Sequence, residues 1–83
     1  MRYRSRTDII SDILGAANGG ATRTKIMYKA YLSYNQLKEY LTLLTENNLL
    51  SYDPYSQTFK TTEKGLRFLD TCNQMDDMIK PVL

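Results

Sequence analysis

Residues 22–41 read TRTKIMYKAYLSYNQLKEYL, and this stretch contains two short helical patterns with a single break between them. The break falls at Leu32-Ser33, and serine is a residue type that commonly caps a helix N-terminus. The two predicted helices are therefore 22–31 and 33–47. Such a short connection, followed by a capped polar helix start, is typical of a helix-turn-helix. The inward-facing residues predicted from helical spacing are Ile26, Met27, Ala30, Leu37, Leu41 and Leu44, with Tyr40 beside them.

A further helix is expected upstream, over residues 7–18. Ser5 or Thr7 is suited to cap its N-terminus, since both hydroxyls accept hydrogen bonds from free backbone N–H groups. The glycines at 19–20 end this helix, because glycine readily adopts the left-handed conformation found at helix C-termini. Its predicted apolar face consists of Ile9, Ile10, Ile13, Leu14 and Ala17.

The residues after helix 33–47 form a strand, turn, strand pattern. β-Forming residues at 49–53 and 58–61 flank a turn at 54–57, in which Pro54 presets the backbone angle. A hairpin in this position is a wing. We therefore predict a mainly α fold with a small β-hairpin, a winged helix-turn-helix in the order helix, helix, helix, hairpin, helix.

The last predicted helix begins at Thr61 or Thr62 and ends near Lys80, before Pro81. One side of this helix carries apolar residues spaced four and three apart, which is the pattern of a coiled-coil seam. Leu66 and Leu69 lie on the other side and are expected to pack on the domain. The residues of the predicted seam, and so of a dimer interface, are Phe68, Cys72, Met75 and Ile79.

A chain of 83 residues supports one hydrophobic core, and a core of this size is marginal by itself. We expect residues 1–61 to form the winged domain and residues 62–83 to form a C-terminal helix packed on it. The coiled-coil-like seam predicts that this helix joins two copies into a homodimer. The alternative is a terminal helix that closes the core of a monomer.

The composition excludes several classes of protein. Cys72 is the only cysteine and histidine is absent, so neither a disulfide framework nor a zinc site is expected. No apolar run approaches the roughly 20 residues of a membrane span, and the basic N-terminus does not lead into a signal peptide. We expect a cytoplasmic, nucleoid-associated protein with no metal, no cofactor and no membrane partner.

Candidate catalytic residues are equally absent from the sequence. The commonest general base is missing, and Cys72 has no histidine to activate its thiol. Asp76 and Asp77 are adjacent, so on a helix they point about 100° apart and do not form a catalytic pair. The glycines at 19–20 do not form a phosphate-binding loop. We predict that the protein is not an enzyme.

Basic residues are concentrated in the first half of the chain. Residues 1–38 contain seven basic and two acidic side chains, whereas residues 39–83 contain four basic and seven acidic side chains. A polyanion such as DNA would be attracted to the first half. The alternative is an ordinary solvated surface.

DNA contacts are predicted where exposed polar side chains occupy the first turns of helices 22–31 and 33–47. Asn35 suits paired hydrogen bonds to adenine, Lys38 suits guanine or phosphate, and Tyr34 suits a sugar or a thymine methyl group. Acidic Glu39 and Glu46 would repel phosphate, so the far end of helix 33–47 should point away from DNA. The complete predicted set is Arg2, Arg4, Arg6, Thr22, Arg23, Thr24, Lys25, Lys29, Ser33, Tyr34, Asn35, Lys38, Tyr55 and Lys60.

The alternating arginines at positions 2, 4 and 6 are similar to basic arms that lie in a minor groove. The alternative is a disordered basic tail. Tyr3, Tyr28 and Tyr31 are expected in the core or at its edge rather than as platforms for stacked bases.

Four stretches of the sequence resemble an archaeal family of small winged helix-turn-helix proteins, which includes regulators and chromatin-associated proteins. These stretches are IISDIL at 9–14, GATRTKIMYKA at 20–30, LSYNQLKEYL at 32–41 and TTEKGL at 61–66. The resemblance spans nearly the whole chain and implies a terminal helix that pairs with a second subunit as an antiparallel coiled coil. It also implies DNA contact through Ser33, Tyr34, Asn35 and Lys38, with support from the preceding helix and the wing. Pro81 and the end of the chain predict a shorter coiled coil than the better-known members of the family have.

The sequence thus favours a dimeric protein that binds double-stranded DNA, a transcription regulator that reads the major groove with helix 33–47. The modest net charge of +2 favours a regulator over an architectural chromatin protein with little sequence preference, which is the first alternative. The second is a winged-helix module that binds protein, which the neighbouring opposite charges of Lys38 and Glu39 would suit. No residues indicate a small-molecule ligand.

Overall fold

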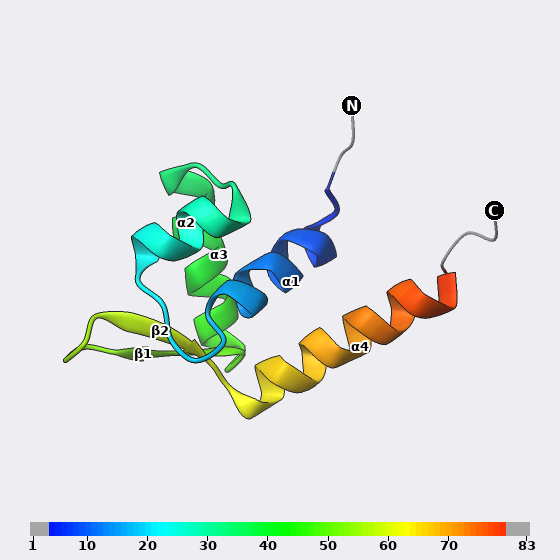
Figure 1. Cartoon of the computed structure of the whole chain (residues 1–83). Helices are drawn as coiled ribbons and strands as arrows, with labels where there is room; N and C mark the ends of the chain where they lie inside the picture. The colour runs from blue at the N-terminus through cyan, green and yellow to red at the C-terminus, as the bar shows by residue number, and fades with distance from the viewer. Residues whose placement is uncertain (1–3, 80–83) are drawn as a thin grey trace.

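The computed structural model describes residues 4–79, with side chains described for residues 4–72. Its elements, in chain order, are α1 (Arg6–Ala16), α2 (Arg23–Ala30), α3 (Tyr34–Glu46), β1 (Leu50–Asp53), β2 (Thr58–Thr61) and α4 (Glu63–Ile79) (Figure 1). The predicted order of helix, helix, helix, hairpin and helix is confirmed. The residues of the sequence predictions that lie outside this description are Arg2, Tyr3, Lys80, Pro81 and the side chains of Met75, Asp76, Asp77 and Ile79.

A serine or threonine precedes each helix and caps its N-terminus. Ser5 caps α1 in a reciprocal box, in which Ser5 Oγ accepts from the Asp8 amide and the Asp8 carboxylate accepts from the Ser5 amide. Thr7 therefore lies inside α1 and does not cap it. The helix ends at Ala16, earlier than expected, because the chain tightens into a turn in which the Gly20 amide donates to the Ala17 carbonyl at 2.9 Å.

The other helix starts follow the same rule. Thr22 caps α2 and Ser33 caps α3, again with a reciprocal box that includes Gln36. Of the two candidates for α4, Thr62 is the cap, since its Oγ1 accepts from the Gly65 amide at 3.0 Å. Thr61 belongs to β2.

The core lies where α1, α2, α3 and the base of the hairpin meet. The predicted inward residues are largely confirmed, and Ile9, Ile10, Met27 and Tyr40 are partly buried against the cluster. The fully buried large side chains of the core are Ile13, Leu14, Ile26, Leu37, Leu44 and Leu50.

The hairpin is an antiparallel pair in which Leu50 lies opposite Thr61 and Asp53 lies opposite Thr58. It is joined to the rest of the fold by one extra bridge, in which Ala21 and Phe59 exchange backbone hydrogen bonds of 2.8 Å in both directions. This bridge holds the wing beside the start of α2.

Helix α4 runs beside α1 and extends past the domain at its C-terminal end (Figure 1). Phe68 packs against the core and Cys72 is only 7% exposed, so these two positions of the predicted seam are covered within a single chain. Leu69 packs on the core as predicted. For Leu66 the prediction is wrong: it is 40% exposed, because the faces of α4 that contain Gly65, Phe68 and Leu69 are the ones turned to the domain.

Two tyrosines were predicted wrongly as core or core-edge residues. Tyr28 is 71% exposed and Tyr31 is 84% exposed. Helix α2 buries Ile26 and Ala30, and Tyr28 lies about 200° around the helix from Ile26, on the opposite face. At the end of the helix the buried place is taken by Leu32 rather than Tyr31. None of the helices in the described part of the chain is long and apolar enough to span a membrane.

Candidate nucleic-acid interface

Three segments that are far apart in the sequence meet on one side of the molecule: the start of α2, the first turn of α3 and the turn of the wing. They enclose a hollow of about 450 Å³. The residues that line it are Thr22, Arg23, Thr24, Met27, Tyr34, Leu37, Ser56 and Gln57. Four members of the predicted DNA-binding set are thereby brought together.

The first turn of α3 projects polar side chains from a fixed backbone. The Ser33 cap and its reciprocal box with Gln36 hold the helix start, while Leu37 anchors it in the core. Tyr34 and Asn35 lie in this turn and, with Lys38, are exposed. The arrangement presents a short polar surface on a rigid helix.

The first turn of α2 offers a second polar surface. The Thr22 hydroxyl accepts a hydrogen bond from the Lys25 amide. Arg23 and Thr24 are exposed. Neither α2 nor α3 has an acidic residue in its first turn. Both helix starts therefore keep the positive end of the helix dipole available to an anion.

Arg23 connects this helix start to the wing. Its guanidinium carbon lies 5.4 Å from the centroid of the Tyr52 ring and 5.2 Å from that of Phe59. The two rings pack against each other at 4.8 Å. Neither Arg23 nor Lys38 forms an ion pair with another described residue, so both positive charges stay available to a polyanion.

An apolar groove of about 390 Å³ separates α3 from the wing, and no residue pattern predicted it. Its floor contains the buried side chains of Leu37, Leu41 and Phe59. Its rim carries Arg23 and Lys38 toward the start of α3 and Glu46 at the far end of that helix. The groove forms only when the hairpin folds back over α3, which the residue pattern of either element alone does not reveal.

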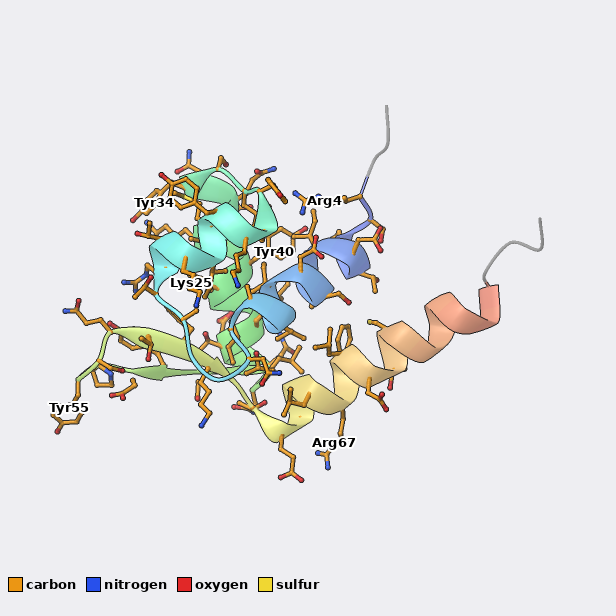
Figure 2. The ribbon with its side chains drawn as sticks, in the orientation of Figure 1. Arg4, Lys25, Tyr34, Tyr40, Tyr55 and Arg67 are labelled. Carbon is orange, nitrogen blue, oxygen red and sulfur yellow. The ribbon has the colours of Figure 1, made fainter. Side chains whose placement is uncertain are left out.

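The tip of the wing is ordered by one carboxylate. Asp53 accepts from the Tyr55 amide and from the Ser56 hydroxyl, both at 2.9 Å. The bond from the Tyr55 backbone, followed by that from Ser56, lowers the pKa of the Asp53 carboxyl below its usual value. Tyr55 is 97% exposed at this tip (Figure 2).

Three predicted cations lie away from the hollow. Lys25 and Lys29 occupy the side of α2 roughly opposite Arg23, since they follow it by two and six residues. Lys60 follows Phe59 in β2, so its side chain projects from the other face of the hairpin.

The two described arginines of the N-terminal run contact the protein itself. Arg4 forms an ion pair with Asp12 and donates to the carbonyls of Ala30 and Tyr31 at the end of α2. The guanidinium of Arg6 lies 6.0 Å from the centroid of the Tyr40 ring. Neither side chain extends from the domain as a free arm would.

Comparison with known proteins identifies the family. The profile of the winged helix-turn-helix family matches residues 3–80, and the chain therefore belongs to this family. It is similar to a crystal structure of Sso10a-2, a DNA-binding protein from Sulfolobus solfataricus, with a TM-score of 0.83 and 22% sequence identity. That likeness covers 90% of this chain and 81% of the other, and at this identity it shows a common fold. No curated protein matches the sequence.

Proposed function

We propose that this protein binds double-stranded DNA and regulates transcription, with the first turn of α3 in the major groove. The observation that carries the proposal is the convergence of two acid-free helix starts and the wing turn around Arg23 and Tyr34. An exposed, capped helix start with polar side chains suits base-edge contact, and a neighbouring helix start suits phosphates. The similar fold of Sso10a-2, a DNA-binding protein, supports the same reading.

Within this surface the side chains divide into two roles. Asn35 reads base edges, because its amide offers a donor and an acceptor side by side. Arg23 and Thr24 bind phosphates and fix the register of the helix on the duplex. Lys38 lies one turn beyond Tyr34 and extends the contact toward bases or phosphate. Glu39 and Glu46 limit the footprint to the first half of α3.

So short a footprint favours a second copy of the chain. We propose a homodimer that forms through the end of α4, the part of the helix beyond its contacts with α1. Helix α4 has 17 residues whereas α1 has 11, and its C-terminal end extends past the domain (Figure 1). The predicted positions on that end are Met75 and Ile79. Met75→Glu should convert the protein to a monomer in sedimentation, and a wild-type protein that is already monomeric would refute the dimer.

The decisive experiment is a titration of labelled duplexes, both random and selected from a pool, at several salt concentrations. We expect binding that weakens with salt by about 0.9 log units of affinity per log unit of salt for each neutralised phosphate. Absence of binding at low salt would refute the proposal and would favour the protein-binding module. Binding without any sequence preference would favour the architectural protein instead.

Variants locate the contact surface in the same assay. Asn35→Ala should reduce the preference for the selected site by about 1–3 kcal/mol while the salt slope stays unchanged. Arg23→Ala should weaken all duplexes alike and lower the slope by about one. Arg67→Ala is the matched control, because this arginine lies on α4, away from Tyr34 and Tyr55 (Figure 2). A loss of affinity in the control as large as that in Arg23→Ala would place the interface elsewhere.

A further inference from the structure

The turn between α2 and α3 contains an uncommon backbone conformation. Tyr31 ends α2 in the left-handed region, with φ 54° and ψ 49°. Glycine or asparagine usually occupies such a position, since other side chains meet a steric cost there. The Tyr31 side chain is largely exposed, so its own packing does not compensate for that cost. Backbone bonds from the Tyr31 and Leu32 amides close the turn, and a side chain from outside it adds further contacts.

Arg4 provides these further contacts. Its Nη1 donates to the Ala30 carbonyl at 2.6 Å and its Nη2 donates to the Tyr31 carbonyl at 3.1 Å. Nη1 also lies 2.9 Å from Asp12 Oδ2 on α1. The two carbonyls are at the end of α2, where the helix leaves acceptors without partners and where its dipole favours a cation.

We propose that Arg4 is a positioning residue for the reading helix: it fastens the left-handed turn to α1 and so fixes the start of α3. Ser33, the cap of α3, follows Tyr31 by two residues, and Leu32 between them is buried. A change in the turn would therefore move Tyr34 and Asn35 directly. The functional part of this inference rests on the proposed DNA contact, but the fastening itself does not.

The chemistry of the contact requires arginine. Three acceptors on two helices converge on one planar guanidinium, which presents several N–H groups in a fixed fork. A lysine ammonium is a compact group on a flexible chain and does not reproduce this spacing. Asp12 balances the charge of Arg4, so this arginine has less to offer a phosphate than Arg23 has.

Amide hydrogen exchange without DNA tests the fastening. The probe is the Leu32 amide, which donates to the Met27 carbonyl at 3.1 Å across the turn. We expect Arg4→Ala and Arg4→Lys each to accelerate its exchange about tenfold, as expected when hydrogen bonds that hold one segment are lost. Arg6→Ala is the matched control and should leave it unchanged. Asp12→Asn keeps the size of the side chain and should give a smaller acceleration.

Unchanged exchange of Leu32 in Arg4→Ala and Arg4→Lys would overturn the proposal. DNA titration separates the positioning role from a phosphate contact. A positioning residue should reduce the preference for the selected site in both variants and leave the salt slope intact. A lower slope in Arg4→Ala, restored by Arg4→Lys, would instead show a phosphate contact and overturn the proposal. Should the wild type bind no DNA, the exchange experiment still decides whether Arg4 holds the turn.

Discussion

Two of the turns that end helices in the described chain reach positive φ with different residues. Between α1 and α2 the chain passes through Gly19 and Gly20, with φ values of 87° and 105°. Between α2 and α3 it passes through Tyr31, with φ 54°. Glycine adopts positive φ without steric cost, whereas tyrosine does not. The first turn is a relaxed connection, and the second is held in place by Arg4.

The two turns lie on different sides of the fold. The glycine turn lies on the side where α1, the base of the hairpin and α4 pack together. One contact on this side is the hydrogen bond that Thr61 Oγ1 donates to the Leu14 carbonyl. The tyrosine turn lies beside the surface that we propose binds DNA. Strained backbone persists where surrounding contacts determine it, and it is often found near functional surfaces. The turn at Gly19 and Gly20 is thus free of left-handed strain, whereas the strained turn at Tyr31 is held by contacts with Arg4.

The largest effect is expected from Gly65→Ala on the packed side. A Cβ at this position would collide with the Leu49 carbonyl oxygen and lie 2.7 Å from Thr61 Cγ2. Because backbone cannot yield locally, we expect a loss of about 3 kcal/mol in the free energy of unfolding by denaturant titration. Gly15→Ala is the matched control: nothing lies within 4 Å of its Cβ, and it should gain about 0.5–1 kcal/mol. Equal effects at the two glycines would contradict the close packing of α4.

The next largest loss of stability is expected from Thr61→Val. Thr61 is buried, and its hydroxyl donates to the Leu14 carbonyl at 2.6 Å. Valine keeps the shape but leaves that carbonyl unpaired, which should cost about 1–2 kcal/mol in the same titration. DNA affinity, measured where the variant is fully folded, should not change. A change in affinity would show that the packed and reading sides are coupled.

Exchanging the residues of the two turns tests directly whether the Tyr31 turn is strained and the glycine turn is relaxed. Tyr31→Gly should stabilise the protein by up to about 1 kcal/mol, because the left-handed strain disappears and little packing is lost. Gly20→Ala should destabilise it by about 1 kcal/mol, since alanine meets that strain at φ 105°. Thermal and denaturant unfolding measure both. A destabilised Tyr31→Gly would mean that the tyrosine ring stabilises the turn after all.

The smallest effect concerns pH at the tip of the wing. The pKa of Asp53 is lowered, first by the Tyr55 amide and then by the Ser56 hydroxyl. The ionised carboxylate should therefore order the tip at all pH values above the ordinary carboxyl pKa of about 3.9, and lose that order as pH falls through the lower folded value. The Tyr55 amide resonance should follow this transition in an NMR pH titration. Asp53→Asn should abolish the transition, and its persistence would assign it to another carboxyl.

Much of the fold could be predicted because local chemistry marks its boundaries. The hydroxyl cap at Ser33, the glycines after α1 and the turn at 54–57 were all confirmed. The errors arose where the outcome depends on distant neighbours. The exposure of Leu66 depends on which face of α4 meets α1, and helical spacing alone leaves two faces to choose from.

The candidate site was less predictable than the fold. The residue types at the starts of α2 and α3 identify polar surfaces, but only folding shows that Arg23 and Tyr34 line one hollow with the wing turn. The contact of Arg4 with the carbonyl of Ala30 spans 26 residues and involves a backbone atom, which no side-chain pattern reports. The placement of Lys60 could have been predicted, because neighbouring residues of a strand such as β2 point to opposite faces and Phe59 belongs to the core.

The bond between Thr61 and Leu14 joins residues 47 positions apart, and the bridge between Ala21 and Phe59 lies beside it. The contacts among α1, α2 and α3 are much shorter in sequence and form with little loss of chain entropy. We therefore expect the three helices to assemble early during refolding and the hairpin to dock late, by closing these long loops. Until the hairpin docks, the hollow between the helix starts and the wing does not exist. In this order of folding, the proposed reading surface is completed only after the three helices have assembled.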